Sequence, residues 1–304
     1  MAAVPIVWRR AASVFVVVPK SVSSLDTHDY EVCFVKRSTG SRFLPGVSVF
    51  PGGKEEEGDR VIAKKLCSDR IEQLSSNICA ARELAEETGL ILSDPLRILS
   101  KQERQSVIDH VSDWNTITNR LLPLCRWISP DDFALAHMPR GGFDTDYFVT
   151  ILPERPTLIP DDVEISEITW LSPPQALERK NELVLTMPQL FLLHDLLGCT
   201  SISTLPSFVD ILRRGVYRYP LKARRIVLSP QSDCAFVMPG DYMHDQYRPR
   251  SGALWKHRAI PRKDPHGRLE VEFQRSNDLL VTARASIDDE KGWCIHTSPT
   301  NPRL

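Results

Sequence analysis

The sequence lacks the features that mark several special classes of protein. Its seven cysteines include no C-x-x-C pair, so neither a zinc knuckle nor a disulfide framework is indicated, and a reducing compartment is the simpler expectation. The apolar run Val14–Val18 is far too short to span a bilayer, and no membrane association is expected. A net charge of −1 argues against a dedicated nucleic-acid binder, and there is no internal repeat or low-complexity tract. The remaining composition, 42% hydrophobic and 25% charged, is that of an ordinary globular protein.

The order of predicted elements indicates an α/β protein. A length of 304 residues suits one core domain with a large appendage, or two domains. Periodicity and turn signals predict strands in the first 200 residues at Ser13–Val18, Glu31–Lys36, Phe143–Leu152 and Ile165–Leu171. Further strands are expected at Ala223–Leu228, Ala235–Met238 and Arg268–Arg275. Helices are expected at Asp59–Leu74, from Ser76 or Asn77 to Gly89, at Lys101–Leu121, and after Ser172 and Thr186. The interleaved order predicts a mixed (α+β) sheet covered by helices.

The most informative stretch is Arg82-Glu83-Leu84-Ala85-Glu86-Glu87-Thr88-Gly89-Leu90. In a helix, Glu83, Glu86 and Glu87 stand at i, i+3 and i+4 and project from one face within about a single turn. Such crowding of negative charge is unfavourable unless a cation lies among the carboxylates. Clustered oxygen ligands suit a hard divalent ion such as Mg²⁺ or Mn²⁺, which favours phosphate chemistry.

A second feature precedes this helix. The run from Phe43 to Gly53 ends in the bend Pro51-Gly52-Gly53. Glycines at such a bend let the backbone approach a ligand or metal closely, which a side chain would prevent.

The bend and the acidic helix together resemble the nudix box, G-x5-E-x7-R-E-U-x-E-E-x-G-U, in which U is a bulky aliphatic residue. The second half of the box matches at every specified position. The first half departs from it, because 28 residues separate Gly53 from Arg82 where the family has 13, an insertion of 15. The role of the box's first glutamate is therefore filled by Asp59, by Glu72, or by neither.

Further motifs narrow the resemblance to one subfamily. The opening Trp8–Ser13, the Phe43–Gly46 and Phe50–Gly53 runs and Phe143-Asp144-Thr145 resemble the peroxisomal coenzyme A diphosphatases of the nudix family. This resemblance implies a nudix fold over residues 8–200 with an insertion at about 54–74. The small and hydroxylated residues of Gly198–Leu205 indicate a boundary, and the pattern beyond it predicts a C-terminal extension of mixed α and β character over 201–304.

The resemblance also implies a mechanism and a set of site residues. The family hydrolyses a diphosphate linked to another group, with water and Mg²⁺ or Mn²⁺. Glu86, Glu87 and the carbonyl of Gly52 would bind metal, and Glu83 would be either a ligand or the base that activates water. Arg82 would orient a carboxylate through a charge-assisted hydrogen bond.

Substrate-binding residues are predicted less sharply. A further carboxylate is expected opposite the helix, for which Glu164 and Glu167 are candidates; Asp144 could bind metal or substrate, or only turn the chain. Lys54 could touch phosphate or be solvated. Because coenzyme A carries a 3′-phosphate besides its diphosphate, extra cations are expected, and the candidates are Arg9, Arg10, Lys36, Arg37 and Arg42.

The expected function is cleavage of coenzyme A or acyl-CoA to 3′,5′-ADP and (acyl-)4′-phosphopantetheine. The alternatives are a diphosphatase for another nucleotide derivative, namely NADH, ADP-ribose or capped RNA, and a nudix module that binds nucleotides without hydrolysis. No nucleic-acid partner is expected apart from capped RNA as an alternative substrate.

Both ends of the chain bear on localisation. The C-terminal Pro302-Arg303-Leu304 has the small, basic, leucine pattern of the peroxisomal import tripeptide, which predicts an import receptor as a partner. Arg9 and Arg10 precede the first acidic residue, Asp26, so a mitochondrial transit peptide is the alternative, as is a cytoplasmic protein. Ser13–Val18 nevertheless has the character of a buried first strand.

Overall fold

A computed structural model describes residues 8–20, 26–41, 44–130, 142–227, 234–239, 243, 257–263 and 269–275. By its internal contacts the chain divides into two compact units, Met1–Val209 and Asp210–Leu304. Of the predicted residues, Arg42 and the C-terminal tripeptide lie outside the described part. None of the described helices is long and apolar enough to cross a membrane.

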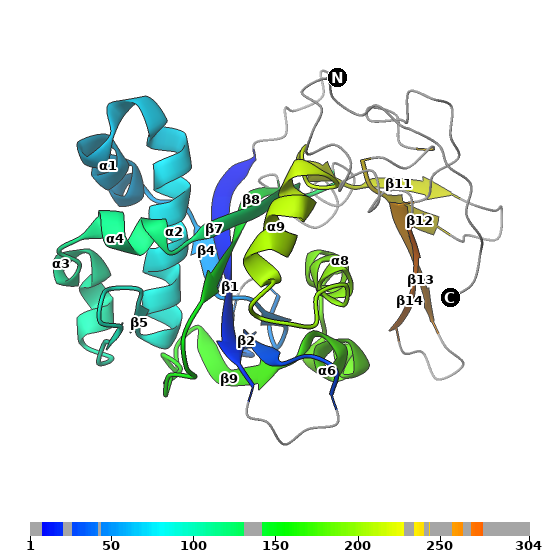
Figure 1. Ribbon diagram of the computed structural model, residues 1–304, viewed down its shortest axis with the longest axis horizontal. Helices are drawn as coiled ribbons and strands as arrows, with labels where there is room; N and C mark the ends of the chain where they lie inside the picture. Colours follow the sequence, from blue (N-terminus) through cyan, green and yellow to red (C-terminus); the bar gives the residue numbers. More distant parts are fainter. Residues whose placement is uncertain are drawn as a thin grey trace. The chain divides into compact units, whose positions relative to one another are not determined.

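The first unit is built on a mixed β-sheet, drawn from blue to green in Figure 1. Its strands follow the order β7-β8-β1-β2-β3, with β4 paired to β1 and β9 to β2. Of these strand pairs, β1 and β8 are parallel, and the other pairs are antiparallel. The strands are β1 (Arg9–Pro19), β2 (Tyr30–Arg37), β3 (Ser48–Val49), β4 (Gly52–Lys54), β7 (Leu122–Ile128), β8 (Phe143–Ile151) and β9 (Ile165–Leu171).

Strand β1 is the centre of this sheet, because it pairs with β2, β4 and β8. Its apolar run Val14–Val18 is buried on both faces, as expected for a strand covered by helices on each side. Val14, Val16 and Val18 belong to the core beneath α2 (Ile71–Thr88). On the opposite face Phe15 stacks on Phe50, with ring centroids 3.7 Å apart.

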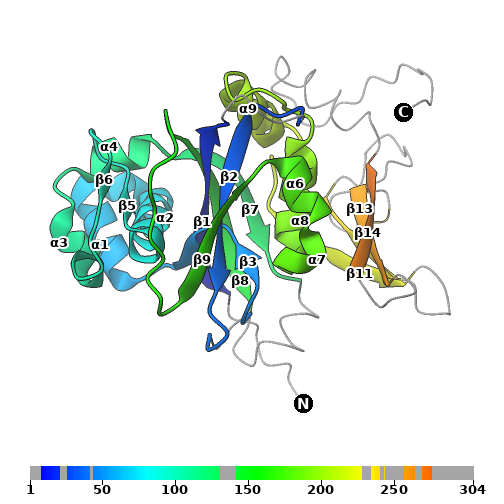
Figure 2. The same ribbon diagram turned by 90° about the horizontal axis from the view of Figure 1, so that it is seen from below.

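Helices cover both faces of the sheet, which confirms the predicted fold class. Figure 2 shows the sheet edge-on, with α1 to α4 on one side and α6 to α8 on the other. The first layer holds α1 (Glu57–Leu66), α2, α3 (Val107–His110), α4 (Trp114–Asn119) and the ribbon β5 (Leu90–Ile91) with β6 (Arg97–Ile98). The second holds α6 (Pro173–Glu178), α7 (Lys180–Leu183) and α8 (Met187–Leu196).

The predicted start of the acidic helix is wrong. Helix α2 begins at Ile71 with Arg70 as its N-cap, so Ser76 and Asn77 lie inside it and are buried. The Ser76 hydroxyl donates to Asp146 of β8 at 2.7 Å, a tertiary contact that replaces its expected capping role. The segment Lys101–Leu121 is mostly helical, as predicted, and consists of a 3₁₀ turn at Glu103–Ser106 followed by α3 and α4.

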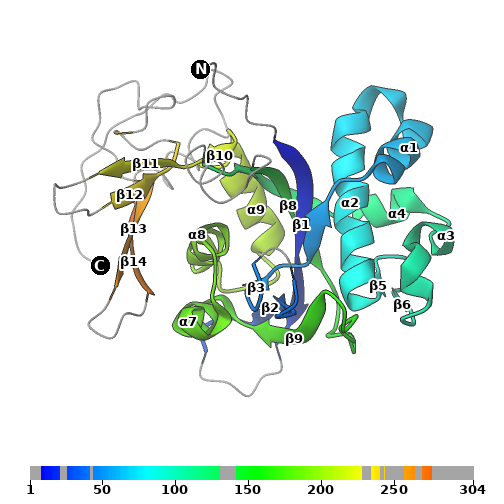
Figure 3. The same cartoon turned by 180° about the vertical axis from the view of Figure 1, so that it is seen from behind.

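In the second unit the described strands form an antiparallel sheet of order β11-β12-β13-β14. They are β11 (Arg224–Val227), β12 (Cys234–Val237), β13 (His257–Lys263) and β14 (Leu269–Arg275), preceded by β10 (Leu221–Lys222). Helix α9 (Leu205–Arg214) contains the boundary between the units. Ala235, Val237 and Ile260 form a small core within this sheet, whose strands are labelled in Figure 3.

Candidate active site

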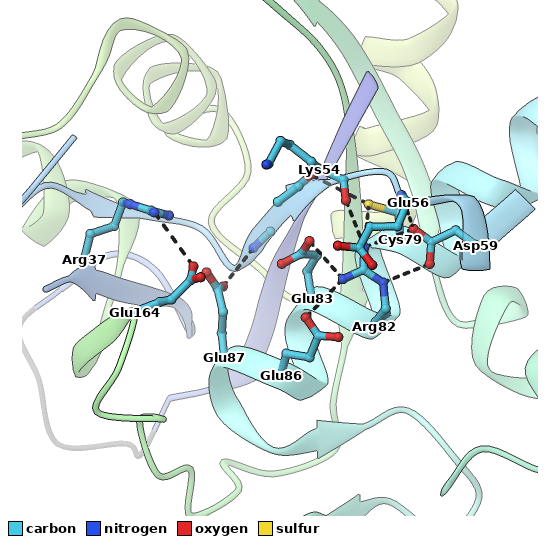
Figure 4. A network of polar contacts seen from close by, with 12 residues as sticks. Arg37, Lys54, Glu56, Asp59, Cys79, Arg82, Glu83, Glu86, Glu87 and Glu164 are labelled. Carbon is cyan, nitrogen blue, oxygen red and sulfur yellow. Dashed lines mark hydrogen bonds and ion pairs between the residues drawn. The ribbon is translucent and has the colours of Figure 1, made fainter. Parts of the chain in front are cut away.

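The acidic residues lie in the last turns of α2, which ends at Gly89. This glycine has φ 84°, a left-handed conformation that suits glycine, and its N–H donates to the Ala85 carbonyl at 2.8 Å. The predicted end of the helix is therefore confirmed. Figure 4 shows Glu83, Glu86 and Glu87 projecting from this turn toward the strand β4 and the loop before it.

Gly52 and Gly53 of β4 lie directly against the carboxylates of Glu87 and Glu83. The Gly52 N–H donates to Glu87 Oε2 at 3.0 Å, and a Cβ on Gly52 would lie 2.3 Å from the Ala12 carbonyl oxygen. A Cβ on Gly53 would lie 2.4 Å from the carboxylate carbon of Glu83. Glycine at both positions thus lets β4 pack closely against β1 on one side and the acidic helix on the other.

Arg82 is the buried centre of the network, with 3% of its surface exposed. Its Nε and Nη2 donate to the two carboxylate oxygens of Asp59 at 2.9 and 3.0 Å. Its Nη1 donates to Glu83 and to Glu86, each at 3.0 Å, and Nη2 also donates to the Lys54 carbonyl at 2.9 Å. The guanidinium thus holds the acidic helix, strand β4 and the start of α1 in one arrangement.

Asp59, one of the two candidates for the role of the first box glutamate, is the carboxylate that pairs with Arg82. It is fully buried, and its Oδ2 also accepts from the Glu56 N–H at 2.9 Å, at the start of α1. Asp59 stands six positions after Gly53, where the family box has its first glutamate, whereas Glu72 is exposed near the start of α2. The additional residues therefore lie between Asp59 and Arg82, and they form most of α1, a 3₁₀ turn and the first turns of α2.

Burial and mutual repulsion raise the pKa values of all three helix carboxylates. Burial, with the charge of Glu86, raises the pKa of Glu83 to about 7 against the opposing effect of Arg82. The pKa of Glu87 is raised well above its usual range by burial and then by Glu83, and that of Glu86 is raised by burial and then by Glu56. This excess of negative charge, which one arginine does not balance, fits a cation.

The helix carboxylates would supply only part of the ligands of a metal ion. Among the described residues, no group of three or more histidine, cysteine or acidic side chains is placed to hold a metal ion by itself. Mg²⁺ is commonly held by one or two carboxylates, with waters and substrate phosphates as its other ligands. Two carboxylates beside a strand of two glycines are consistent with such a site.

Glu164 and Arg37 lie on the far side of Glu87, as Figure 4 shows. Arg37 ends β2, and its Nη2 is 3.9 Å from Glu164 Oε2, just ahead of β9. The negative charge of Glu164 adds to the raised pKa of both Glu83 and Glu87, and Arg37 opposes that rise at Glu87. The structure thus brings both predicted residues to the acidic helix.

The other predicted residues lie elsewhere or have other partners. Glu167 faces Lys36 on β2, with Nζ and Oε2 3.8 Å apart and both side chains largely exposed. Asp144 is buried, lies 3.0 Å from Arg10 Nη1 and pairs with both oxygens to Arg126. Burial raises the pKa of Asp144, but the hydrogen bonds and charges of Arg126 and Arg10 outweigh it, so the pKa is lowered and the carboxylate is held in an ion pair with these two arginines.

One predicted residue, Lys54, contacts the site through its backbone, and one contact residue, Cys79, was not predicted. Lys54 takes part through its backbone carbonyl, which accepts from Arg82, while its side chain is exposed. Cys79 was missed, although it is buried between the two halves of the site. Its thiol donates to the Gly53 carbonyl at 3.7 Å and lies 3.8 Å from Arg82 Nη2. Its place four residues before Glu83 on the same helix face was the available signal.

Comparisons with known proteins agree with this geometry. The profile of the NUDIX domain matches residues 9–190. The acyl-coenzyme A diphosphatase NUDT19 of Gallus gallus is 27% identical over 79% of this chain and 80% of that protein. The protein of the same name from Xenopus laevis is 24% identical over 73% of each chain. In fold, a NUDIX hydrolase from Alicyclobacillus acidocaldarius matches with a TM-score of 0.52 at 21% identity, covering 66% of this chain and 96% of that one.

A carboxylate-rich helix end facing a glycine-rich strand, on a mixed sheet between helices, defines a hydrolase of the diphosphatase class. The chain belongs to the nudix hydrolase family. Enzymes of this family use divalent metal ions, and the carboxylates described above fit that requirement.

Proposed function

We propose that this enzyme hydrolyses the diphosphate of coenzyme A or acyl-CoA, releasing 3′,5′-ADP and 4′-phosphopantetheine or its acyl derivative. The observation that carries the proposal is the similarity to two acyl-coenzyme A diphosphatases. It extends over 79% and 73% of this chain, beyond the 9–190 span of the nudix domain itself.

The metal in this proposal is Mg²⁺ or Mn²⁺, held by Glu86, Glu87 and the carbonyl oxygen of Gly52, with Glu83 as a further ligand or as the base. When bound, such an ion neutralises charge on phosphate oxygens and makes water more acidic. Glu86 is the most exposed of the three carboxylates, with 39% of its side chain accessible, which leaves it open to a ligand from solvent.

The chain's own groups then have distinct tasks. Glu83, whose pKa is raised to about 7, is poised to take a proton from the attacking water near neutral pH. Arg82 fixes the Glu83 and Glu86 carboxylates through two hydrogen bonds of 3.0 Å. Arg37 faces the acidic cluster from β2 and can bind a phosphate oxygen of the substrate, while Glu164 is the second carboxylate able to accept or orient the water.

The test is product analysis with the purified full-length protein. CoA, acetyl-CoA, NADH, ADP-ribose and capped RNA are each incubated with Mg²⁺ or Mn²⁺, and products are separated by chromatography. We expect 3′,5′-ADP from CoA and acetyl-CoA at a higher kcat/KM than any product from the other three. Preferred turnover of another substrate would overturn the assignment to CoA, and no turnover of any would overturn the metal-dependent hydrolysis.

A variant pair tests the metal assignment. Glu86→Gln removes one negative ligand from the site and should abolish turnover while the melting temperature stays close to wild type. Glu72→Gln is the matched control, because Glu72 is exposed on the same helix and should leave turnover unchanged. Near-normal activity of Glu86→Gln would refute the proposed ligand.

We also propose that the protein is imported into peroxisomes through Pro302-Arg303-Leu304, with the import receptor as its partner. A fluorescent protein fused ahead of the full chain should co-localise with a peroxisomal marker and lose that localisation when the three residues are deleted. A cytoplasmic or mitochondrial signal from the intact fusion would contradict the proposal.

A further inference from the structure

The turn that carries Glu164 is organised by one side chain, Asp161. Its carboxylate accepts hydrogen bonds from the backbone N–H groups of Val163 at 3.2 Å, Glu164 at 3.1 Å and Ile165 at 2.7 Å. Between them Asp162 adopts a left-handed φ of 64°, and its N–H donates to the Ile165 carbonyl at 3.0 Å. A carboxylate that accepts from three successive N–H groups fixes the path of the backbone through the turn.

Ser38 holds the same turn from the opposite side. Its N–H donates to the Glu164 carbonyl at 2.7 Å, and its hydroxyl donates to the Val163 carbonyl at 2.9 Å. Ser38 directly follows Arg37, the cation that faces Glu164. The backbone of Glu164 is therefore bound at its N–H by Asp161 and at its carbonyl by Ser38, although 65% of the Glu164 side chain is exposed.

Arg104 connects this turn to the end of the acidic helix. It is 6% exposed, its Nη1 donates to the Ile159 carbonyl at 2.7 Å, and its Nε donates to the Leu99 carbonyl at 3.4 Å. The Leu99 N–H in turn donates at 2.8 Å to the carbonyl of Gly89, which ends α2. The positive charge of Arg104 also faces the negative charge of Asp161. A series of hydrogen bonds thus runs from the end of α2 to Ile159, two residues before Asp161.

From these contacts we propose that Asp161 is a positioning residue for the hydrolysis. It holds the Glu164 carboxylate at the acidic end of α2, beside Glu83 and Glu87, where that carboxylate can meet the substrate and its attacking water. This inference rests on the proposed function, in that it takes Glu164 to act in the reaction. An exposed glutamate on an unrestrained turn would sample many positions, and misplacement by about 1 Å can reduce a rate roughly 100-fold.

The test compares two substitutions of Asp161 with a matched control. Asp161→Ala removes every acceptor of the turn, whereas Asp161→Asn keeps an oxygen in the place of Oδ1, which serves all three N–H groups. Asp113→Ala is the control, because Asp113 also accepts backbone N–H groups, from Asn115 and Thr116 at the start of α4. Each variant is made in the wild type and in a Glu164→Gln background.

The first readout is amide hydrogen exchange, which does not depend on turnover. Exchange at 163–165 should become faster by about tenfold in Asp161→Ala, since a hydrogen bond to a charged acceptor is worth at least that factor, and should stay near wild type in Asp161→Asn. Unchanged exchange in Asp161→Ala would overturn the inference whatever the substrate proves to be. Failure of the proposed function would instead show as an absence of turnover in wild type with the exchange effect intact.

The second readout is the dependence of the kinetic effect on Glu164. We expect Asp161→Ala to lower kcat roughly 10- to 100-fold with little change in KM, and Asp161→Asn to restore most of it. In the Glu164→Gln background Asp161→Ala should cause no further loss, because the group it positions is already absent. Equal losses in both backgrounds, or a comparable loss in Asp113→Ala, would show a purely structural role and refute the inference.

Discussion

The buried pair of Asp59 and Arg82 leads to the sharpest prediction. Asp59 is fully buried and Arg82 almost so, and they share two hydrogen bonds of 2.9 and 3.0 Å. Removing one partner of a buried ion pair typically destabilises a protein by about 3–5 kcal/mol, because the other charge is left uncompensated. For Asp59→Asn we expect about 3 kcal/mol, since Arg82 keeps Glu83 and Glu86 and the amide oxygen still accepts one hydrogen bond.

The assay is urea unfolding with a double-mutant cycle. Asp59→Asn, Arg82→Met and their combination are compared with wild type, following hydrogen exchange within α1 and α2 so that the first unit is reported by itself. The combined variant should be less destabilised than the sum of the single variants by about 2 kcal/mol, because each single variant leaves an unpaired buried group. A loss below about 0.5 kcal/mol in Asp59→Asn, the range of ordinary surface substitutions, would refute the reasoning.

Asp59→Glu keeps the negative charge but lengthens the side chain, and it places the family's usual glutamate at this position. It therefore tests the effect of side-chain size on stability without a change of charge. The extra methylene enters a fully buried space and should itself destabilise by about 1–3 kcal/mol. Wild-type stability in this variant would mean that the site has more room than the structure shows.

Two further predictions concern Gly53 and Asp26. Gly53→Ala should lower kcat about 100-fold while the protein stays folded, because the new Cβ would lie 2.4 Å from the Glu83 carboxylate carbon and displace it; unchanged kcat would contradict the close contact. Against the effect of burial, hydrogen bonds from Ser172 and Lys20 lower the pKa of Asp26 to about 2. Since its folded pKa lies below its unfolded value, Asp26 should contribute about 2 kcal/mol above pH 4 that disappears as the pH falls toward 2. Urea unfolding of wild type and Asp26→Asn should therefore differ at pH 5 and converge near pH 2, and a constant difference would count against the assignment.

The sequence predicted the end of the acidic helix α2 but not its beginning. Its functional end was predictable because the spacing of Glu83, Glu86 and Glu87 and the stop at Gly89 are local properties of the chain. Its beginning was not, because Ser76 and Asn77 have good capping side chains that tertiary burial overrides. The helix instead begins at Ile71, and Ser76 contacts Asp146 of β8, far away in sequence.

Strands with weak local signals were missed for a related reason. β7 includes Pro123 and Arg126, and β13 includes Pro261, residues that disfavour a strand when judged alone. Pairing of β7 with β8 and of β13 with β14 determines these segments. Such pairings join distant parts of the chain, so local patterns do not disclose them.

Where the sequence offered two candidate carboxylates for one role, only the structure distinguished between them. Glu164 and Glu167 are equivalent by composition and nearly so by position, yet the register shift between Lys36 and Arg37 separates their surroundings. Glu164 meets Arg37 and the acidic helix, whereas Glu167 meets Lys36 on the exposed strand. The sequence likewise left Asp59 and Glu72 as alternatives for the first glutamate of the box. In the structure it is Asp59 that binds the buried guanidinium of Arg82.

The double use of Asp59 has a consequence for how the enzyme assembles. One carboxylate accepts the Glu56 N–H that begins α1 and also binds Arg82, which in turn holds Glu83 and Glu86. A single carboxylate therefore links the first turn of α1 to the positions of Glu83 and Glu86, and a substitution of Asp59 is expected to disturb both. The acidic helix and the segment inserted before it are thus joined through one buried side chain.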